Sequence, residues 1–146
     1  PLDDPRTVHG RYSRWSVYAQ TKLADLLFTF ELDRRLRAKN LPVTALAAHP
    51  GYAATGLMAG AYGGGRLSSM LQGLFAIGGQ RPELAAWPSL LAATADLPGS
   101  TYVGPRDFFG MRGRPTLVGT TRVARDEEAA RRLWEVSEDA TGVRYP

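Results

Sequence analysis

The fold class is decided by the segment VTALAAHPG, residues 43–51 of the 146-residue chain. Its first six residues are mostly apolar and do not alternate with polar ones, and the segment ends in a Pro-Gly pair. A short apolar run of this kind is typical of a strand buried on both faces of a parallel sheet. We therefore predict a buried strand over residues 43–48 with a turn after it.

The segment before this strand predicts a long helix. Residues 13–39 contain no glycine or proline, and Ser13 is a suitable N-cap. The run LADLLFTFEL, residues 23–32, is apolar on nearly every side of the predicted helix. Such a helix is buried on several faces, within a domain or between subunits. Asn40 is expected to close it, ahead of Pro42.

Helix and strand signals continue to alternate toward the C-terminus. We predict a helix over residues 82–96, kinked by Pro88, and a short strand over residues 101–103. A surface loop over residues 106–122 and an amphipathic helix over residues 125–141 follow. The inner side of the last helix is expected to carry Ala129, Leu133 and Val136, with Trp134 nearby, and Gly142 is expected to stop it. This order predicts an α/β fold with parallel strands.

Composition excludes several classes of protein. The chain carries 18 basic and 14 acidic residues, a net charge of +4, and it has no cysteine and two histidines. Thiolate metal sites and disulfides are therefore excluded, and we expect no metal site. The basic residues form no five-residue run, so we expect no nucleic-acid partner. There is no run of 18 apolar residues and no leader after Pro1, so we expect a cytoplasmic protein without a transmembrane segment.

The residues most indicative of chemistry are Tyr18 and Lys22. They are four apart on the predicted helix and so share a face. A lysine ammonium beside a phenol favours the phenolate, and a phenol in that setting can exchange a proton with an alcohol or carbonyl oxygen. By itself the pair is equally compatible with an ordinary helix surface.

The neighbourhood of this pair resembles a known family. YSRWSVYAQTKLADLLF, residues 12–28, resembles the active-site helix of short-chain dehydrogenases/reductases, in particular the branch of retinol dehydrogenases and protochlorophyllide reductases. HPGYAAT, residues 49–55, resembles the Pro-Gly turn of that family, and GSTYVGP, residues 99–105, its last sheet strand. The resemblance covers most of the chain. It implies the C-terminal half of a Rossmann-like, doubly wound parallel sheet.

The resemblance also implies a reaction and residue roles. The enzyme would interconvert a carbonyl and an alcohol by hydride transfer with NAD(P)(H), NADP being favoured by family alone. Tyr18 would donate or accept the proton, and Lys22 would favour the phenolate and bind the nicotinamide ribose. Pro50 and Gly51 would let the backbone pass close to the nicotinamide, and Thr55 would bind its carboxamide or the pyrophosphate. His49 is expected to be structural.

Residues 52–80 would match the substrate lid of the family. Apolar side chains in this segment, among them Tyr52, Leu57, Met58 and Tyr62, would line it. They suggest a small lipophilic carbonyl or alcohol as substrate, although a lid that packs on its own domain would have the same composition.

Parts of the family pattern are missing from the sequence. There is no glycine-rich dinucleotide fingerprint between a first strand and a helix, and no serine stands far enough upstream of Tyr18 for the catalytic role. We therefore interpret residues 1–146 as the C-terminal portion of a single NAD(P)-binding domain that lacks its N-terminal half. Such a portion alone is expected to bind cofactor poorly and to be unstable or to aggregate.

A second interpretation is a remnant of the family without catalysis that serves only as an oligomerisation or interaction module. The apolar run of residues 23–32 favours it, because one sheet face needs less apolar surface. In either interpretation we expect a homo-oligomer formed through the helix of residues 13–39.

Overall fold

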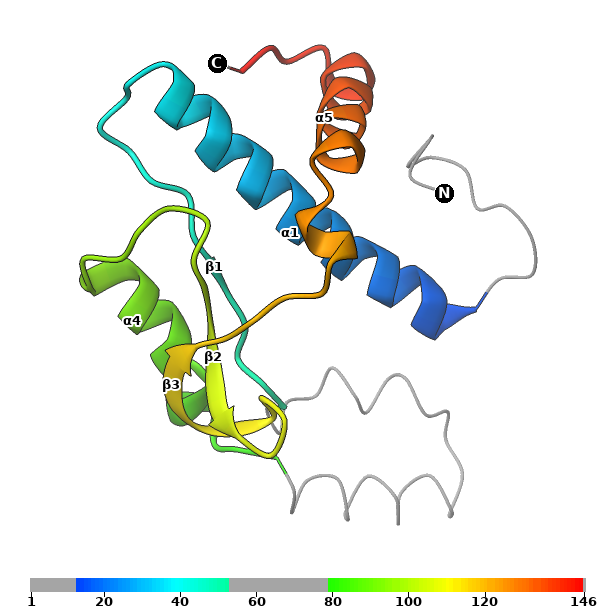
Figure 1. Cartoon of the computed structure of the whole chain (residues 1–146). Helices are drawn as coiled ribbons and strands as arrows, with labels where there is room; N and C mark the ends of the chain where they lie inside the picture. The colour runs from blue at the N-terminus through cyan, green and yellow to red at the C-terminus, as the bar shows by residue number, and fades with distance from the viewer. Residues whose placement is uncertain (1–12, 53–78, 146) are drawn as a thin grey trace. The chain divides into compact units, whose positions relative to one another are not determined.

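The computed structural model describes residues 13–52 and 79–145 (Figure 1). They fall into two compact units, which are described separately. The helical unit comprises Pro1–Ala47, Pro98–Thr101 and Gly119–Pro146, and the sheet unit comprises Ala48–Leu97 and Tyr102–Val118. The chain contains both α-helices and β-strands, as predicted for an α/β fold.

The helical unit is built on α1, Arg14–Ala38. The Ser13 side chain caps it by accepting a hydrogen bond from the Ser16 N–H. After Ala38 the chain turns through Asn40, whose φ of 51° lies in the left-handed region that asparagine tolerates better than most residues. The predicted helix over residues 13–39 is thus confirmed at both ends.

The second long helix, α5, Glu127–Thr141, packs against α1 (Figure 1). The Asp126 carboxylate caps its first turn, and Gly142 ends it with a φ of 70°. A short 3₁₀ helix, η1, Val123–Arg125, precedes it. This confirms the predicted amphipathic helix and its stop at Gly142.

The core between α1 and α5 consists of Leu27, Ala130 and Leu133, all buried. Leu133 lies on the inner side of α5 as predicted, and Trp134, predicted nearby, is buried with it, whereas Ala129 and Val136 are only partly buried. The Trp134 ring stacks on Phe28 of α1, with centroids 5.0 Å apart. Aromatic stacking of this kind adds to the free energy gained from burial alone.

The sheet has the strand order β1-β2-β3: Ala47–Ala48, Tyr102–Asp107 and Arg112–Leu117. Ala47 N–H donates to Thr101 O and His49 N–H to Val103 O, each at 2.9 Å, so both segments advance in the same direction. β2 and β3 form an antiparallel hairpin. The predicted parallel pairing of the strands near residues 43–48 and 101–103 is confirmed for β1 and β2. The parallel sheet is wrong for β3, which is antiparallel, and the surface loop predicted over residues 106–122 is wrong where β3 runs, Arg112–Leu117.

The extent of the first strand was also predicted wrongly. The expected strand over residues 43–48 is reduced to Ala47–Ala48, and Val43 is 57% exposed. Among the described residues β1 is paired with β2 alone, so no second strand covers its other edge. The apolar composition of residues 43–48 predicts a strand that is buried on both faces, but within the described residues this segment is not buried on both faces.

Two prolines lie opposite each other in the hairpin, Pro105 on β2 and Pro115 on β3. Val118 N–H donates to Tyr102 O, so the hydrogen-bonded positions of this ladder are 102–118 and, two residues on, 104–116. The proline pair falls between hydrogen-bonded positions, where backbone nitrogens point away from the partner strand. Neither proline therefore removes a hydrogen bond from the hairpin.

Helices α3, Pro82–Ala85, and α4, Trp87–Thr94, complete the sheet unit. α4 packs against β2 and β3 (Figure 1). The single helix predicted over residues 82–96 is broken at Ala86, just ahead of Pro88, which is the physical effect expected of that proline. No helix in the described ranges is long and apolar enough to cross a membrane.

Candidate active site

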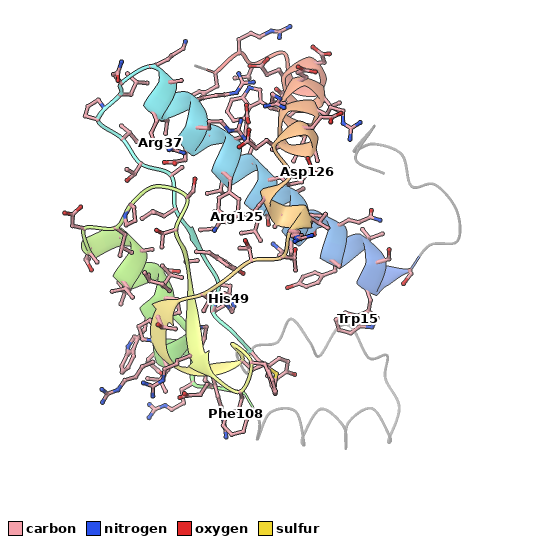
Figure 2. All side chains as sticks on the ribbon, viewed as in Figure 1. Trp15, Arg37, His49, Phe108, Arg125 and Asp126 are labelled. Atoms are coloured by element: carbon pink, nitrogen blue, oxygen red, sulfur yellow. The ribbon has the colours of Figure 1, made fainter. Side chains whose placement is uncertain are left out.

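Tyr18 lies in the second turn of α1, with Lys22 one turn further on the same face. The Lys22 Nζ is 5.8 Å from the centroid of the Tyr18 ring. Trp15, which projects from the first turn (Figure 2), packs edge-on against Tyr18 with ring centroids 6.5 Å apart. Tyr18 is 50% exposed, so a ligand can reach it.

An additional residue of this face is Asp25. Its carboxylate pairs with the Lys22 ammonium at 2.7 Å, and both side chains are more than half exposed. The ion pair is therefore well solvated and contributes little to stability. The spacing of three residues between Lys22 and Asp25 is the sequence signal that could have identified this contact.

The second group of predicted site residues follows β1 in the sheet unit. Gly51 has a φ of 69°, a left-handed conformation that L side chains rarely adopt. The space that a Gly51 side chain would need is filled by the Met111 carbonyl group and the Pro105 ring. Tyr52 N–H donates to Met111 O at 2.7 Å. Glycine is therefore required here by the β2–β3 hairpin itself.

Gln80 holds this turn in place and was not singled out by the sequence. Its side-chain amide donates to Pro50 O and accepts from Gly113 N–H, and its backbone N–H donates to Tyr52 O at 2.9 Å. Gln80 is buried, with all these partners inside the sheet unit. A lone glutamine at the end of a glycine-rich segment gives no sequence signal for such a role.

His49 packs inside the sheet unit (Figure 2). Its Nδ1 accepts a hydrogen bond from Gly51 N–H at 3.2 Å, and its ring lies 5.0 Å from that of Tyr102. A side chain at Gly104 would collide with the imidazole. Burial lowers the pKa of His49 below its ordinary value, because desolvation disfavours the charged ring. The neutral ring, protonated on Nε2, fits these contacts.

We expect this histidine to make the protein less stable in mild acid. As pH falls through about 6.5, the unfolded chain takes up the His49 proton before the folded chain does, so the free energy of unfolding decreases until the lowered folded pKa is passed. Above that range both states are neutral and the effect is absent. Urea unfolding across this range should show the decrease, and His49→Gln should abolish it. An identical pH profile for the variant would contradict the assignment.

The structure brings Tyr18 together with Lys22, and Pro50 together with Gly51 and Tyr52. Other predicted site residues lie outside the described ranges, namely Thr55, Leu57, Met58 and Tyr62. Within the described ranges, no group of three or more His, Cys, Asp or Glu side chains could hold a metal ion.

Comparison with known proteins assigns the family. Human retinol dehydrogenase 13 is 37% identical over 99% of this chain, and mouse polyprenol dehydrogenase is 37% identical over 95%. Both are short-chain dehydrogenases/reductases. The chain belongs to this family. The resemblance carried by residues 12–28 and 49–55 is thereby confirmed at the level of the family.

The chain is also similar to a solved structure. A crystal structure of an uncharacterized protein from Mycobacterium paratuberculosis matches the whole chain with a TM-score of 0.74 and 41% sequence identity. The chain covers 46% of that protein, 42% of the human retinol dehydrogenase and 40% of the mouse polyprenol dehydrogenase. It thus spans about two fifths of the length of the curated dehydrogenases that it matches. No protein-family model matches the chain.

Proposed function

We propose that this chain supplies the proton-transfer residues of an NAD(P)-dependent oxidoreductase that interconverts a carbonyl and an alcohol. The observation that carries the proposal is the exposed Tyr18 phenol with the Lys22 ammonium on the same face of α1. An acid–base group must be within reach of its substrate and able to exist in both protonation states. The exposed Tyr18 phenol is within reach of a ligand, and the Lys22 cation lies on the same face.

These two side chains also fit the reacting end of a nicotinamide cofactor. An ammonium group can donate to ribose hydroxyls, and the phenol can reach the oxygen of a substrate held beside the ring. The bound nicotinamide supplies or accepts the hydride at the substrate carbon. In reduction Tyr18 gives its proton to the carbonyl oxygen, and Lys22 stabilises the phenolate that remains. In oxidation Tyr18 takes the proton of the alcohol.

The proposed substrate class is lipophilic. Two relatives are named for retinol and polyprenol, which are long apolar alcohols. The apolar side chains of residues 52–80 support the same class. NADP as the cofactor is supported only by the family resemblance, so both nicotinamide cofactors belong in any assay.

The test uses the longest natural reading frame that contains this sequence. The purified protein is incubated with NADPH or NADH and a medium-chain aldehyde, or with NADP or NAD and the corresponding alcohol, and the nicotinamide absorbance is followed. We expect turnover with at least one pair. A folded protein that oligomerises but turns over no pair would favour the interaction module instead, for which the exposed Trp15 on α1 is the supporting observation.

A further inference from the structure

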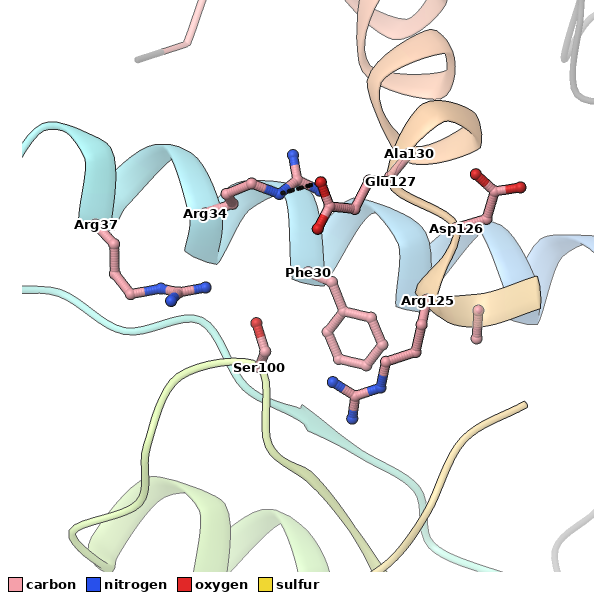
Figure 3. A pocket seen from close by; sticks show the side chains of 9 residues that line it. Phe30, Arg34, Arg37, Ser100, Arg125, Asp126, Glu127 and Ala130 are labelled. Atoms are coloured by element: carbon pink, nitrogen blue, oxygen red, sulfur yellow. Dashed lines mark ion pairs between the residues drawn. The ribbon is translucent and has the colours of Figure 1, made fainter. Parts of the chain in front are cut away.

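The helical unit contains a cavity that the proposed reaction does not use. Its volume is about 160 Å³, and it lies between α1, η1 and the start of α5 (Figure 3). The lining residues are Phe30, Arg34, Arg37, Ser100, Ala124, Arg125, Asp126, Glu127 and Ala130. Phe30 is twelve residues beyond Tyr18 on α1, which is roughly 18 Å along the helix axis. The cavity is therefore separate from the Tyr18 face.

Two guanidinium groups face this cavity. Figure 3 shows Arg37 and Arg125 pointing toward each other, with the Ser100 hydroxyl between them. Arg125 is held by its Nε, which donates to Thr120 Oγ1 at 2.9 Å, and by the Phe30 ring 4.6 Å away. It forms no ion pair with any residue in the described part of the chain. Arg125 is thus a fixed cation without an acidic partner there.

The acidic residues of the cavity wall already have partners. Asp126 Oδ1 accepts from the N–H groups of Glu128 and Ala129, both at 3.0 Å, as the cap of α5. Glu127 pairs with Arg34 at 3.9 Å and Arg131 at 3.6 Å. Two of the three lining arginines are also paired with acids, Arg34 with Glu127 and Arg37 with Asp33. The attraction for an anion therefore rests on Arg125, which has no acidic partner in the described part of the chain, and on the remaining N–H groups of Arg37.

Behind the cavity wall, Asp33 is fully buried and saturated with donors. Arg37 Nε lies 3.0 Å from Asp33 Oδ2, and Ser100 Oγ donates to the same oxygen at 2.9 Å. The single hydroxyl proton of Ser100 is therefore used, and its oxygen can only accept. The terminal N–H groups of Arg37 and Arg125 remain as donors facing the cavity.

We propose that this cavity binds a small oxyanion that carries a hydroxyl of its own, for which hydrogen phosphate is the best match. Guanidinium groups bind phosphate and carboxylate oxygens with paired hydrogen bonds. The hydroxyl of hydrogen phosphate can donate to Ser100 Oγ, whereas sulfate and ionised carboxylates have no proton to give. The volume is below the roughly 300–1,000 Å³ of sites for drug-sized ligands, so a small ion fits.

The test measures binding of phosphate, sulfate and acetate, each at constant ionic strength adjusted with sodium chloride. Calorimetry gives the affinity, and ligand-dependent thermal unfolding checks it. We expect phosphate to bind more tightly than sulfate or acetate. Arg125→Gln should weaken phosphate binding at least about tenfold, since the unpaired cation is lost. Arg125→Lys, which keeps the charge without the planar fork, should give an intermediate loss.

The matched control is Arg132→Gln on α5. Arg132 is an exposed arginine that pairs with Glu128 at 3.9 Å and does not line the cavity, so its loss should leave phosphate binding unchanged. Arg37 is a poorer choice, because its removal would leave the buried Asp33 uncompensated. Equal phosphate affinity in the Arg125→Lys, Arg125→Gln and unmodified proteins would overturn the proposal, as would sulfate binding as tightly as phosphate. Neither readout depends on oxidoreductase activity.

Discussion

Replacing Tyr18 with phenylalanine is expected to lower kcat by a factor of about 10²–10⁴ while leaving the protein folded. The substitution removes only the phenolic oxygen, and the ring retains its edge-on contact with Trp15. Since the ring is half exposed, no buried group loses a partner that the fold depends on. Initial rates with the substrate and cofactor identified in the assay above would measure the loss, in the same reading frame.

The control for this variant is Tyr145→Phe. Tyr145 is an exposed tyrosine near the C-terminus, with its ring 6.4 Å from Trp134, and it has no role in the proposed proton transfer. Its substitution should leave kcat unchanged. Lys22→Gln should also lower kcat, because the phenolate loses a stabilising cation. A Tyr18→Phe enzyme that works as fast as the Tyr145→Phe enzyme would exclude Tyr18 as the acid–base group.

Replacing Gly51 with alanine is expected to destabilise the protein by about 2–5 kcal/mol. Two costs add. An alanine at a φ of 69° occupies the left-handed region, at about 1–2 kcal/mol. Its Cβ would also collide with the Met111 carbonyl and lie 2.7 Å from Pro105 Cγ, and a backbone group cannot rotate away as a side chain can. The hairpin must shift, at about 1–3 kcal/mol, and the hydrogen bond from Tyr52 N–H to Met111 O is strained.

Two other glycines separate these costs. Gly142 has nearly the same φ, 70°, and open space around it, so Gly142→Ala should show the conformational cost alone, about 1–2 kcal/mol. Gly119 has neither a left-handed φ nor a neighbour, and its substitution should change stability by less than about 0.5 kcal/mol. Chemical denaturation of the three variants gives the comparison. If Gly51→Ala lowered the free energy of unfolding no more than Gly142→Ala does, a side chain at position 51 would not collide with the hairpin.

The helices were predictable because their signals are local. α1 is a long segment without glycine or proline that begins at a serine cap, and α5 lies between an aspartate cap and a left-handed glycine. The Tyr18–Lys22 pair follows from the same helical spacing. These features depend on residues within one or two turns of one another, so a sequence contains them in full.

The sheet was less predictable because its pairing is not local. β3 has the sequence RGRPTL, whose charges, glycine and proline indicate a loop when taken alone. It becomes a strand because Phe108 and Phe109 adopt left-handed φ values of 51° and 57° and turn the chain back onto β2. Nothing in two consecutive phenylalanines signals such a turn. The Gln80 contacts around Pro50 and Gly113 were missed for the same reason, since they join positions about 30 residues apart.

The proline pair of the hairpin also affects how one molecule meets another. In the described sheet β3 is an outer strand, and the nitrogen of Pro115 points away from β2. A strand from a second molecule that added to this side would find no N–H donor at Pro115, and β3 also carries two charged residues just before that position, Arg112 and Arg114. The sequence predicts a tendency to aggregate, but the outer edge of β3 cannot pair continuously with a strand of another molecule. The missing N–H of Pro115 interrupts the ladder of hydrogen bonds that cross-β growth from this edge would need.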